Sequence, residues 1–204
     1  MARNQGQGTD GEFYCARCGG DRNYRARTGR LPGRRGLRVV CTDCRARYGP
    51  EVLEAPTCRG FVLLIRDAAR ALALAALAAD GSCDAASREA ACAAVRSAGS
   101  PECQPGNLLD EMVELQQVDD PDATRVDGLP PTAAARLRAA LVPLGPHLAE
   151  PGRAHLLATA ARVALADGAY TPNERAMLMA AGHALTMPDA QIRQVLREAA
   201  AAGR

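Results

Sequence analysis

The sequence predicts a mainly α-helical protein, with a small β module near the N-terminus followed by a seven-helix bundle that contains an internal duplication. Two C-x-x-C pairs lie within residues 13–48, among glycines that suit short strands and turns. From Gly60 onward, helix start and stop signals follow one another closely. Of the 204 residues, 48% are apolar but only 3% are aromatic. An interior built mainly of Ala, Leu and Val favours close-packed helices over a β-sandwich.

The chain is predicted to have four parts. Residues 1–12, which are polar and rich in Gly and Gln, are expected to form a disordered tail. Residues 13–48 form the β module, residues 49–59 a linker that contains proline, and residues 60–204 the helical domain. The N-terminus lacks the apolar segment of an export signal, and the longest apolar run, at 61–79, is interrupted by charges. Both observations favour a cytoplasmic location.

Start and stop signals place the seven helices. Glycine follows most of them, and proline or aspartate begins several. The clearest start is at Thr171, whose hydroxyl can cap the helix, with Pro172 at the first helical position and Glu174 placed to close a capping box. The predicted helices span residues 60–79, 84–98, 107–118, 131–143, 151–167, 171–186 and 188–202.

An internal repeat relates two halves of the helical domain. A shift of 87 residues aligns Asp80 with Asp167 and Arg88 with Arg175, and a glycine follows each of the two aspartates. Each aligned Asp-Gly lies between two predicted helices. The repeat therefore indicates a duplicated helical unit.

Charge divides the chain near the same boundary. All 25 basic residues are Arg, and residues 1–47 hold eleven of them against four carboxylates. Residues 48–204 hold fourteen Arg against nineteen carboxylates. A basic module in front of an acidic domain describes the chain better than its net charge of +2. The exclusive use of Arg also has a simpler explanation, because a GC-rich coding sequence enriches Arg without any phosphate partner.

The four cysteines of the β module have the spacing of a metal site. Cys15 and Cys18 form one C-x-x-C pair and Cys41 and Cys44 the other, with 22 residues between the pairs. A two-residue spacer lets a tight turn aim two sulfurs at one point, and two such turns complete the tetrahedral four-sulfur site that zinc prefers. We therefore predict a structural Zn²⁺ ion and a zinc ribbon over residues 13–48. Two disulfides or unrelated thiols are the alternatives, and a chain without an export signal favours metal.

The arginines of the ribbon suggest an alternative function. Ten Arg lie from Arg17 to Arg47 against two carboxylates, and this charge suits contact with phosphates. One aromatic residue, Tyr24, lies between the two cysteine pairs to stack on a base. Nucleic-acid binding through the Arg-rich ribbon is therefore one alternative for the function of this protein.

Two segments of the helical domain have the sequences VALADGAYTPNER, at residues 163–175, and LTMPDAQIRQVL, at residues 185–196. Both resemble segments of the TerB-like tellurite-resistance family. The resemblance covers roughly residues 60–204, and a four-cysteine ribbon ahead of such a domain resembles a bacterial subgroup of the family. It implies seven helices in duplicated halves and a non-enzymatic adaptor role in stress responses. It also implies protein partners, met in the cytoplasm or at the inner membrane face. No small-molecule substrate is evident.

The resemblance further implies an acidic cluster that binds a divalent cation such as Ca²⁺ or Mg²⁺. The matching positions are Asp80, Asp167 and Glu174, and Ser87 stands where the first half would match Glu174. Both aspartates fall at predicted helix C-termini, where the helix dipole disfavours a carboxylate and a cation would offset the penalty. We therefore expect the three carboxylates to converge on one pocket. The alternative is that they only cap helices.

The remaining cysteines have no ligand spacing. Cys83 and Cys92 are predicted to be small core residues. No Ser/His/Asp or Cys/His constellation can be named in the sequence, so no enzymatic activity is predicted. The four cysteines without ligand spacing are Cys58, Cys83, Cys92 and Cys103.

Overall fold

The computed structural model of the chain describes residues 10–31, 34–81, 84–118 and 123–202. The chain divides into two compact units, residues 1–63 and residues 64–204. Within the described part, four β-strands come first and seven α-helices follow, with two short 3-10 helices between them. This order confirms the predicted fold class, a mainly α-helical protein with a small β module ahead of a seven-helix bundle.

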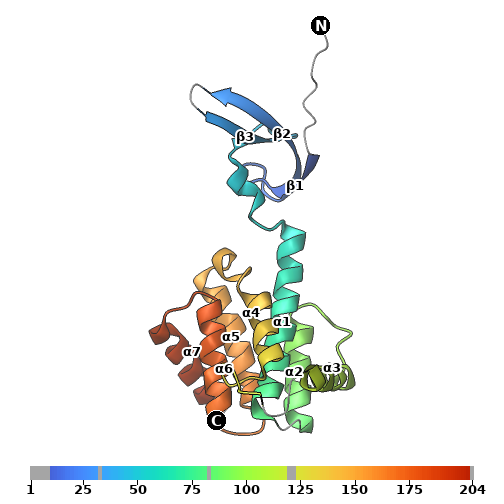
Figure 1. Cartoon of the computed structure of the whole chain (residues 1–204), viewed down its shortest axis with the longest axis vertical. Helices are drawn as coiled ribbons and strands as arrows, with labels where there is room; N and C mark the ends of the chain where they lie inside the picture. The colour runs from blue at the N-terminus through green and yellow to red at the C-terminus, as the bar shows by residue number, and fades with distance from the viewer. Residues whose placement is uncertain (1–9, 32–33, 82–83, 119–122, 203–204) are drawn as a thin grey trace. The chain divides into compact units, whose positions relative to one another are not determined.

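The first unit is built on an antiparallel sheet in which each strand pairs with the next along the chain. Figure 1 shows β2 and β3 as a long hairpin. The first strand begins at Asp10, which pairs with Arg25, so the sheet starts before the predicted boundary at residue 13. The predicted disordered tail falls mostly on residues 1–9, which lie outside the described residues. The strands are β1 (Asp10–Tyr14), β2 (Asp21–Leu31), β3 (Arg34–Cys41) and β4 (Arg47–Tyr48).

The core of this first unit is small and partly aromatic. Phe13 is buried, and its ring meets those of Tyr24 and Tyr48 edge-on, with ring centroids 5.8 Å and 5.5 Å away. The 3-10 helix η1 (Pro50–Leu53), which lies in the predicted linker, packs apolar side chains on this core. A core with so few large side chains supplies little stability of its own, so the ribbon needs a further source of stability.

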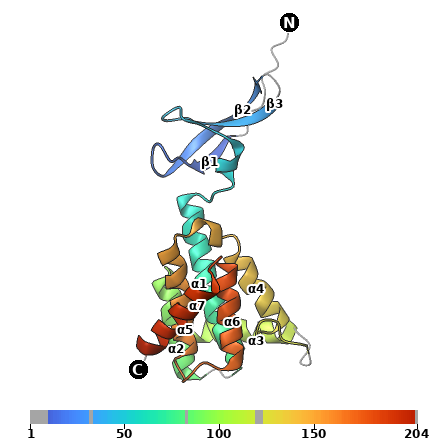
Figure 2. The ribbon, with the colours of Figure 1, turned by 90° about the vertical axis from the view of Figure 1, so that its left-hand side faces the viewer.

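The bundle contains the seven helices and the 3-10 helix η2 (Gly145–His147). Figures 1 and 2 both show α1 running among the other helices. The helices are α1 (Cys58–Asp80), α2 (Ala85–Ser97), α3 (Pro105–Val118), α4 (Pro131–Leu141), α5 (Glu150–Ala164), α6 (Pro172–Ala184) and α7 (Asp189–Ala202).

Helix α1 is apolar on all sides over much of its length. Every residue from Ala71 to Ala79 is buried, as expected for a helix enclosed by others. Nearer its start, Arg66 pairs with a carboxylate at 3.3 Å and Arg70 with another at 2.5 Å. These charges mark where α1 reaches the bundle surface. No helix in the described part of the chain is long and apolar enough to cross a membrane.

The 87-residue repeat is visible in the backbone of α2 and α6. Adding 87 to the bounds of α2 gives the bounds of α6. The side chains of Asp84 and Thr171 each cap their helix by accepting a hydrogen bond from the N–H three residues on. After the helix, Gly99 and Thr186 both take left-handed backbone, with φ of 99° and 60°. The duplication thus extends to the backbone at both ends of the helix, at positions where the two halves have different residues.

Replacing Thr186 with glycine should stabilise the bundle. A left-handed conformation costs a non-glycine residue roughly 1–2 kcal/mol. Glycine loses about 0.5–1 kcal/mol more backbone entropy on folding, so the expected net gain is about 0.5–1 kcal/mol in thermal or urea denaturation. The repeat supplies the matched control: Gly99→Ala, at φ 99°, should lose stability. A Thr186→Gly protein less stable than the wild type would contradict this account.

One predicted helix end is wrong. Helix α5 ends at Ala164, because the N–H groups of Leu165 and Ala166 bond back to the last helical carbonyls and tighten the final turn. The prediction carried this helix to residue 167. Asp167 therefore lies exposed in the turn before α6 and not at a helix C-terminus. The dipole argument for a cation at Asp167 loses its basis.

Candidate metal centre

Two turns of the same backbone shape present the four cysteines. In each turn, the residue after the second cysteine donates its N–H to the carbonyl of the first: Gly19 to Cys15 at 2.9 Å, and Arg45 to Cys41 at 3.2 Å. Gly19 and Arg45 both have left-handed backbone, with φ of 68° and 61°. The left-handed residue after the second cysteine is thus common to both turns. Two equivalent turns can aim their sulfurs at one point.

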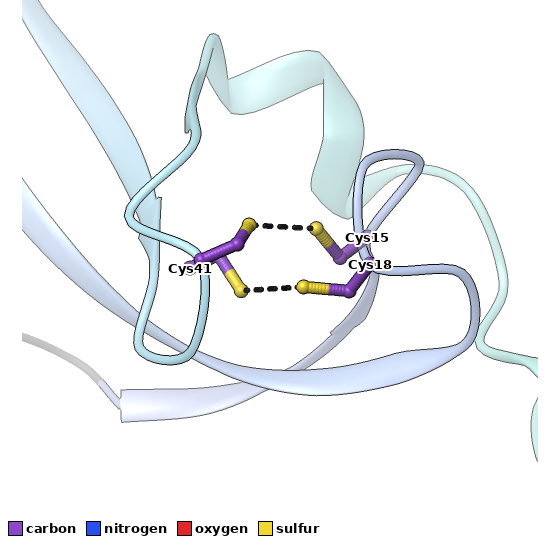
Figure 3. A group of neighbouring side chains, drawn as sticks. Cys15, Cys18 and Cys41 are labelled. Atoms are coloured by element: carbon purple, nitrogen blue, oxygen red, sulfur yellow. Dashed lines mark hydrogen bonds between the residues drawn. The ribbon is translucent and has the colours of Figure 1, made fainter.

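The sulfur atoms have the spacing of a metal-centred site. The Sγ atoms of Cys15 and Cys44 are 3.7 Å apart, and those of Cys18 and Cys41 are 3.9 Å apart. Figure 3 shows Cys15 and Cys18 pointing their sulfurs toward the turn that carries Cys41. A tetrahedral site with metal–sulfur bonds of about 2.3 Å separates its sulfurs by about 3.8 Å. A disulfide needs about 2.05 Å.

The four sulfurs all lie within 4.8 Å of one another. Two disulfides would require only that the sulfurs lie close together in pairs. Cys15 and Cys41 are fully buried, and Cys18 and Cys44 are partly buried. Among the described residues, this is the one group of three or more Cys, His or acidic side chains placed to hold a metal ion. The four predicted ligands are therefore brought together and can bind a metal.

Tyr48 supports the site from β4. Its hydroxyl lies 3.2 Å from the Sγ of Cys15 and accepts the backbone N–H of Arg17 at 3.2 Å. Burial acts to raise the pKa of the Cys15 thiol, but hydrogen bonds from Tyr48 and from the N–H groups of Cys18 and Arg17 outweigh it and lower this pKa to about 6. The hydrogen bonds thus favour a thiolate at Cys15, the form that binds metal.

The Cys18 thiol behaves in the opposite way. The hydrogen bond to Cys44, together with burial, raises the pKa of the Cys18 thiol to about 12. Sulfurs this close cannot all carry negative charge unless a cation neutralises them. Metal binding must therefore release protons, and the affinity for metal falls as the pH is lowered.

Asp21 links the sheet to the start of α1. Its carboxylate accepts the N–H of Cys58 at 2.7 Å and that of Arg59 at 3.3 Å. The hydrogen bond from Cys58 is the main reason that the pKa of Asp21 is lowered. A carboxyl group whose pKa is lowered on folding stabilises the folded state at pH values above its unfolded-state pKa. This stabilisation is lost as the pH falls through the folded-state pKa. A carboxylate from a strand thus caps the helix together with the Thr57 hydroxyl, which accepts the N–H of Gly60 at 3.0 Å.

The two left-handed positions give a matched pair of predictions. A Cβ added at Gly19 would meet nothing within 4 Å, so Gly19→Ala costs only the conformational term, roughly 1–2 kcal/mol. This corresponds to roughly tenfold weaker metal binding, measured by competition with a chelator. Arg45→Gly removes the same strain and should make binding tighter. Equal metal affinity in the two variants would contradict the account.

The bundle sequence matches a known family. Residues 66–197 match the family model described as Tellurite resistance protein TerB. The chain belongs to the TerB family. The match confirms the resemblance seen in the sequence, and it leaves the four-cysteine ribbon outside the TerB region. No curated protein and no solved structure matched the chain.

The acidic residues of the TerB region are placed differently from one another. Glu174 is buried, and its carboxylate accepts the N–H of Thr171 at 2.7 Å, while the Thr171 hydroxyl accepts the N–H of Glu174 at 3.2 Å. This confirms the predicted capping box. Asp167 is exposed, and the side chain of Asp80 lies outside the described residues. The convergence of the three carboxylates on a Ca²⁺ or Mg²⁺ ion stays a prediction.

The TerB bundle also contains a thiol pair that the sequence did not indicate. Cys92 in α2 and Cys103 before α3 are buried, with their Sγ atoms 3.2 Å apart. Burial, with the Cys92 contact, raises the pKa of Cys103 to about 11. The predicted core position of Cys92 is confirmed, and Cys83 lies outside the described residues. Since the two residues are on different segments, only tertiary structure reveals the pair.

Proposed function

We propose that this TerB protein is a non-enzymatic adaptor in bacterial stress responses such as tellurite resistance, with a structural zinc ion in its ribbon. The four-sulfur geometry carries the proposal, because four thiolates leave no open coordination position for water or substrate. A metal held in this way stabilises a small module instead of catalysing a reaction. The TerB match supports the link to tellurite and to a non-enzymatic role.

Zinc is the proposed metal because a tetrahedral set of four thiolates is typical of structural zinc, although iron accepts the same ligands. Native mass spectrometry and elemental analysis of the purified protein should find one Zn²⁺ per chain. Iron in the same site, or a metal-free protein with four reactive ribbon thiols, would contradict the proposal.

The adaptor role implies protein partners, met in the cytoplasm or at the inner face of the membrane. The test uses a tellurite-sensitive bacterium that expresses the wild type, Cys41→Ser or Cys58→Ser. Cys58 is an exposed cysteine outside the metal cluster, so its variant is the matched control. We expect Cys41→Ser alone to lose protection. Catalytic consumption of tellurite by the purified protein with a thiol or nicotinamide reductant would show an enzyme instead.

A specific arrangement on the ribbon favours nucleic acid as a second candidate. Arg27 lies opposite Arg38 across β2 and β3. Val40 lies on the same face of the sheet and is opposite Arg25 on one side and Arg47 on the other. Four arginines thus surround one valine on the face away from the buried core. Like charges directly opposite each other destabilise a sheet unless an anion lies between them.

The phosphate backbone of a nucleic acid would supply such anions. Titration of fluorescent duplex and single-stranded DNA and RNA should then show binding that weakens steeply with salt. The double variant Arg27→Gln/Arg38→Gln should reduce both the affinity and the salt slope, whereas Arg162→Gln, on the exposed side of α5, should change neither. No binding at low salt would leave the adaptor role as the sole candidate.

A further inference from the structure

A hollow of about 390 Å³ is lined by residues of α6 and α7 and by Tyr170, which precedes α6. Near their connected ends the two helices pack tightly, since a Cβ on Gly182 would lie 2.5 Å from the Cδ1 of Ile192. The hollow is lined by residues between 170 and 179, in and before the first half of α6, and by residues between 193 and 200 along α7. Its floor is apolar and consists of Met179, Leu196 and Ala200.

Three arginines line the same hollow. Arg193 and Arg197 are four residues apart on α7, and each is three residues from an apolar residue of the floor, so they share one helix face with it. Arg175 lies four residues before Met179 on α6, on the face that looks toward α7. No carboxylate lines the hollow. The hollow therefore combines an apolar floor with three cationic side chains.

The charge of these arginines is largely uncompensated. Arg193 is 3.5 Å from Asp189 in an exposed pair, and Arg175 and Arg197 form no ion pair with any described residue. Of the nine other arginines that the structure describes in the bundle, five have a carboxylate partner. The paired arginines are Arg66, Arg70, Arg96, Arg136 and Arg138.

Tyr170 completes the wall without adding negative charge. Its hydroxyl donates to the carbonyl of Leu196 at 3.4 Å. Burial, with a contribution from the Glu174 charge, raises the pKa of Tyr170 to about 12, so the phenol stays neutral at physiological pH. The carboxylate of Glu174 is itself hydrogen-bonded to the N–H of Thr171.

We propose that this hollow binds an amphiphilic anion, a single carboxylate or phosphate group on a short apolar chain. Guanidinium groups bind both anions through paired hydrogen bonds, and the apolar floor removes the chain from water. The volume of about 390 Å³ is at the lower end of the range for small-molecule sites, which suits one short chain. The site goes beyond the proposed adaptor function and uses none of the ribbon residues.

Calorimetric titration of the full chain with octanoate and octyl phosphate tests the proposal. Acetate and inorganic phosphate lack the chain, and octanol lacks the charge. Because each buried CH₂ contributes about 0.8 kcal/mol, two buried groups make the chain-bearing anions roughly tenfold tighter binders. Acetate binding as tightly as octanoate, or octanol binding as tightly, would overturn the proposal.

Variants locate the binding to the hollow. Arg197→Gln should weaken octanoate binding roughly tenfold, whereas Arg162→Gln, outside the hollow, should leave it unchanged. Equal binding by the wild type and Arg197→Gln would overturn the assignment. Vesicles of phosphatidylglycerol and of phosphatidylcholine distinguish the source: Arg197-dependent binding to the anionic vesicles identifies a membrane lipid, and octanoate binding without vesicle binding identifies a soluble anion.

Discussion

Replacing Cys41 with serine is expected to release the metal and unfold the ribbon, while the helical signal of the bundle remains. Cys41 is fully buried and, with Cys18, forms one of the two close sulfur pairs. A serine hydroxyl stays protonated at neutral pH and cannot replace a thiolate ligand. Structural zinc contributes about 10–16 kcal/mol in small zinc domains, far more than a core built around Phe13 and Val39 can supply alone.

Hydrogen exchange resolved by peptide separates the two units in this experiment. Residues 10–53 should lose protection in Cys41→Ser, and the bundle should keep it, because the second unit has its own buried residues in every helix that the structure describes. Cys58→Ser should keep one metal ion and full ribbon protection. A Cys41→Ser protein that retains metal would contradict the assignment of ligands. Loss of helical circular dichroism would show that the bundle depends on the ribbon.

The four metal ligands could be predicted because their geometry is local. A C-x-x-C turn closes on its own backbone, and the glycine at position 19 supplies the left-handed residue that it needs. The hydroxyl of Tyr48 could not be predicted, since it reaches Cys15 only after β4 has paired with β3. The same limit applies to Arg45, which takes the conformation of glycine although its residue type gives no sign of it.

The helices were predictable where their caps are local and not where they depend on tertiary contacts. Thr171 and Glu174 close their capping box within four residues, so the start of α6 was clear from sequence. The start of α1 has a local cap, the Thr57 hydroxyl, which accepts the N–H of Gly60, and a second cap from Asp21, which is far away along the chain. The hollow between α6 and α7 is a further case, because arginines four residues apart are typical of a solvated helix face until the second helix is in place.

The loop before α4 joins the two repeated halves of the bundle. The guanidinium of Arg125 donates to the carbonyls of Ala78 and Ala79 at 3.3 Å each, which satisfies the last turn of α1, and to the carbonyl of Gly128 at 2.8 Å. Gly128 has φ of 79°, and a Cβ placed there would lie 2.2 Å from the backbone oxygen of Asn173 in the first turn of α6. The loop thus contacts the end of α1 and the beginning of α6.

Gly128→Ala should therefore destabilise the bundle strongly. The left-handed conformation costs roughly 1–2 kcal/mol, and a clash with helix backbone adds roughly 1–3 kcal/mol, because neither partner is a flexible side chain. A loss of about 3 kcal/mol lowers the melting temperature of a domain this size by roughly 10 °C. Gly106→Ala is the matched control, since its Cβ meets nothing within 4 Å and alanine favours the helix α3. If Gly128→Ala melts at the same temperature as the Gly106→Ala control, this loop does not hold α6 in place.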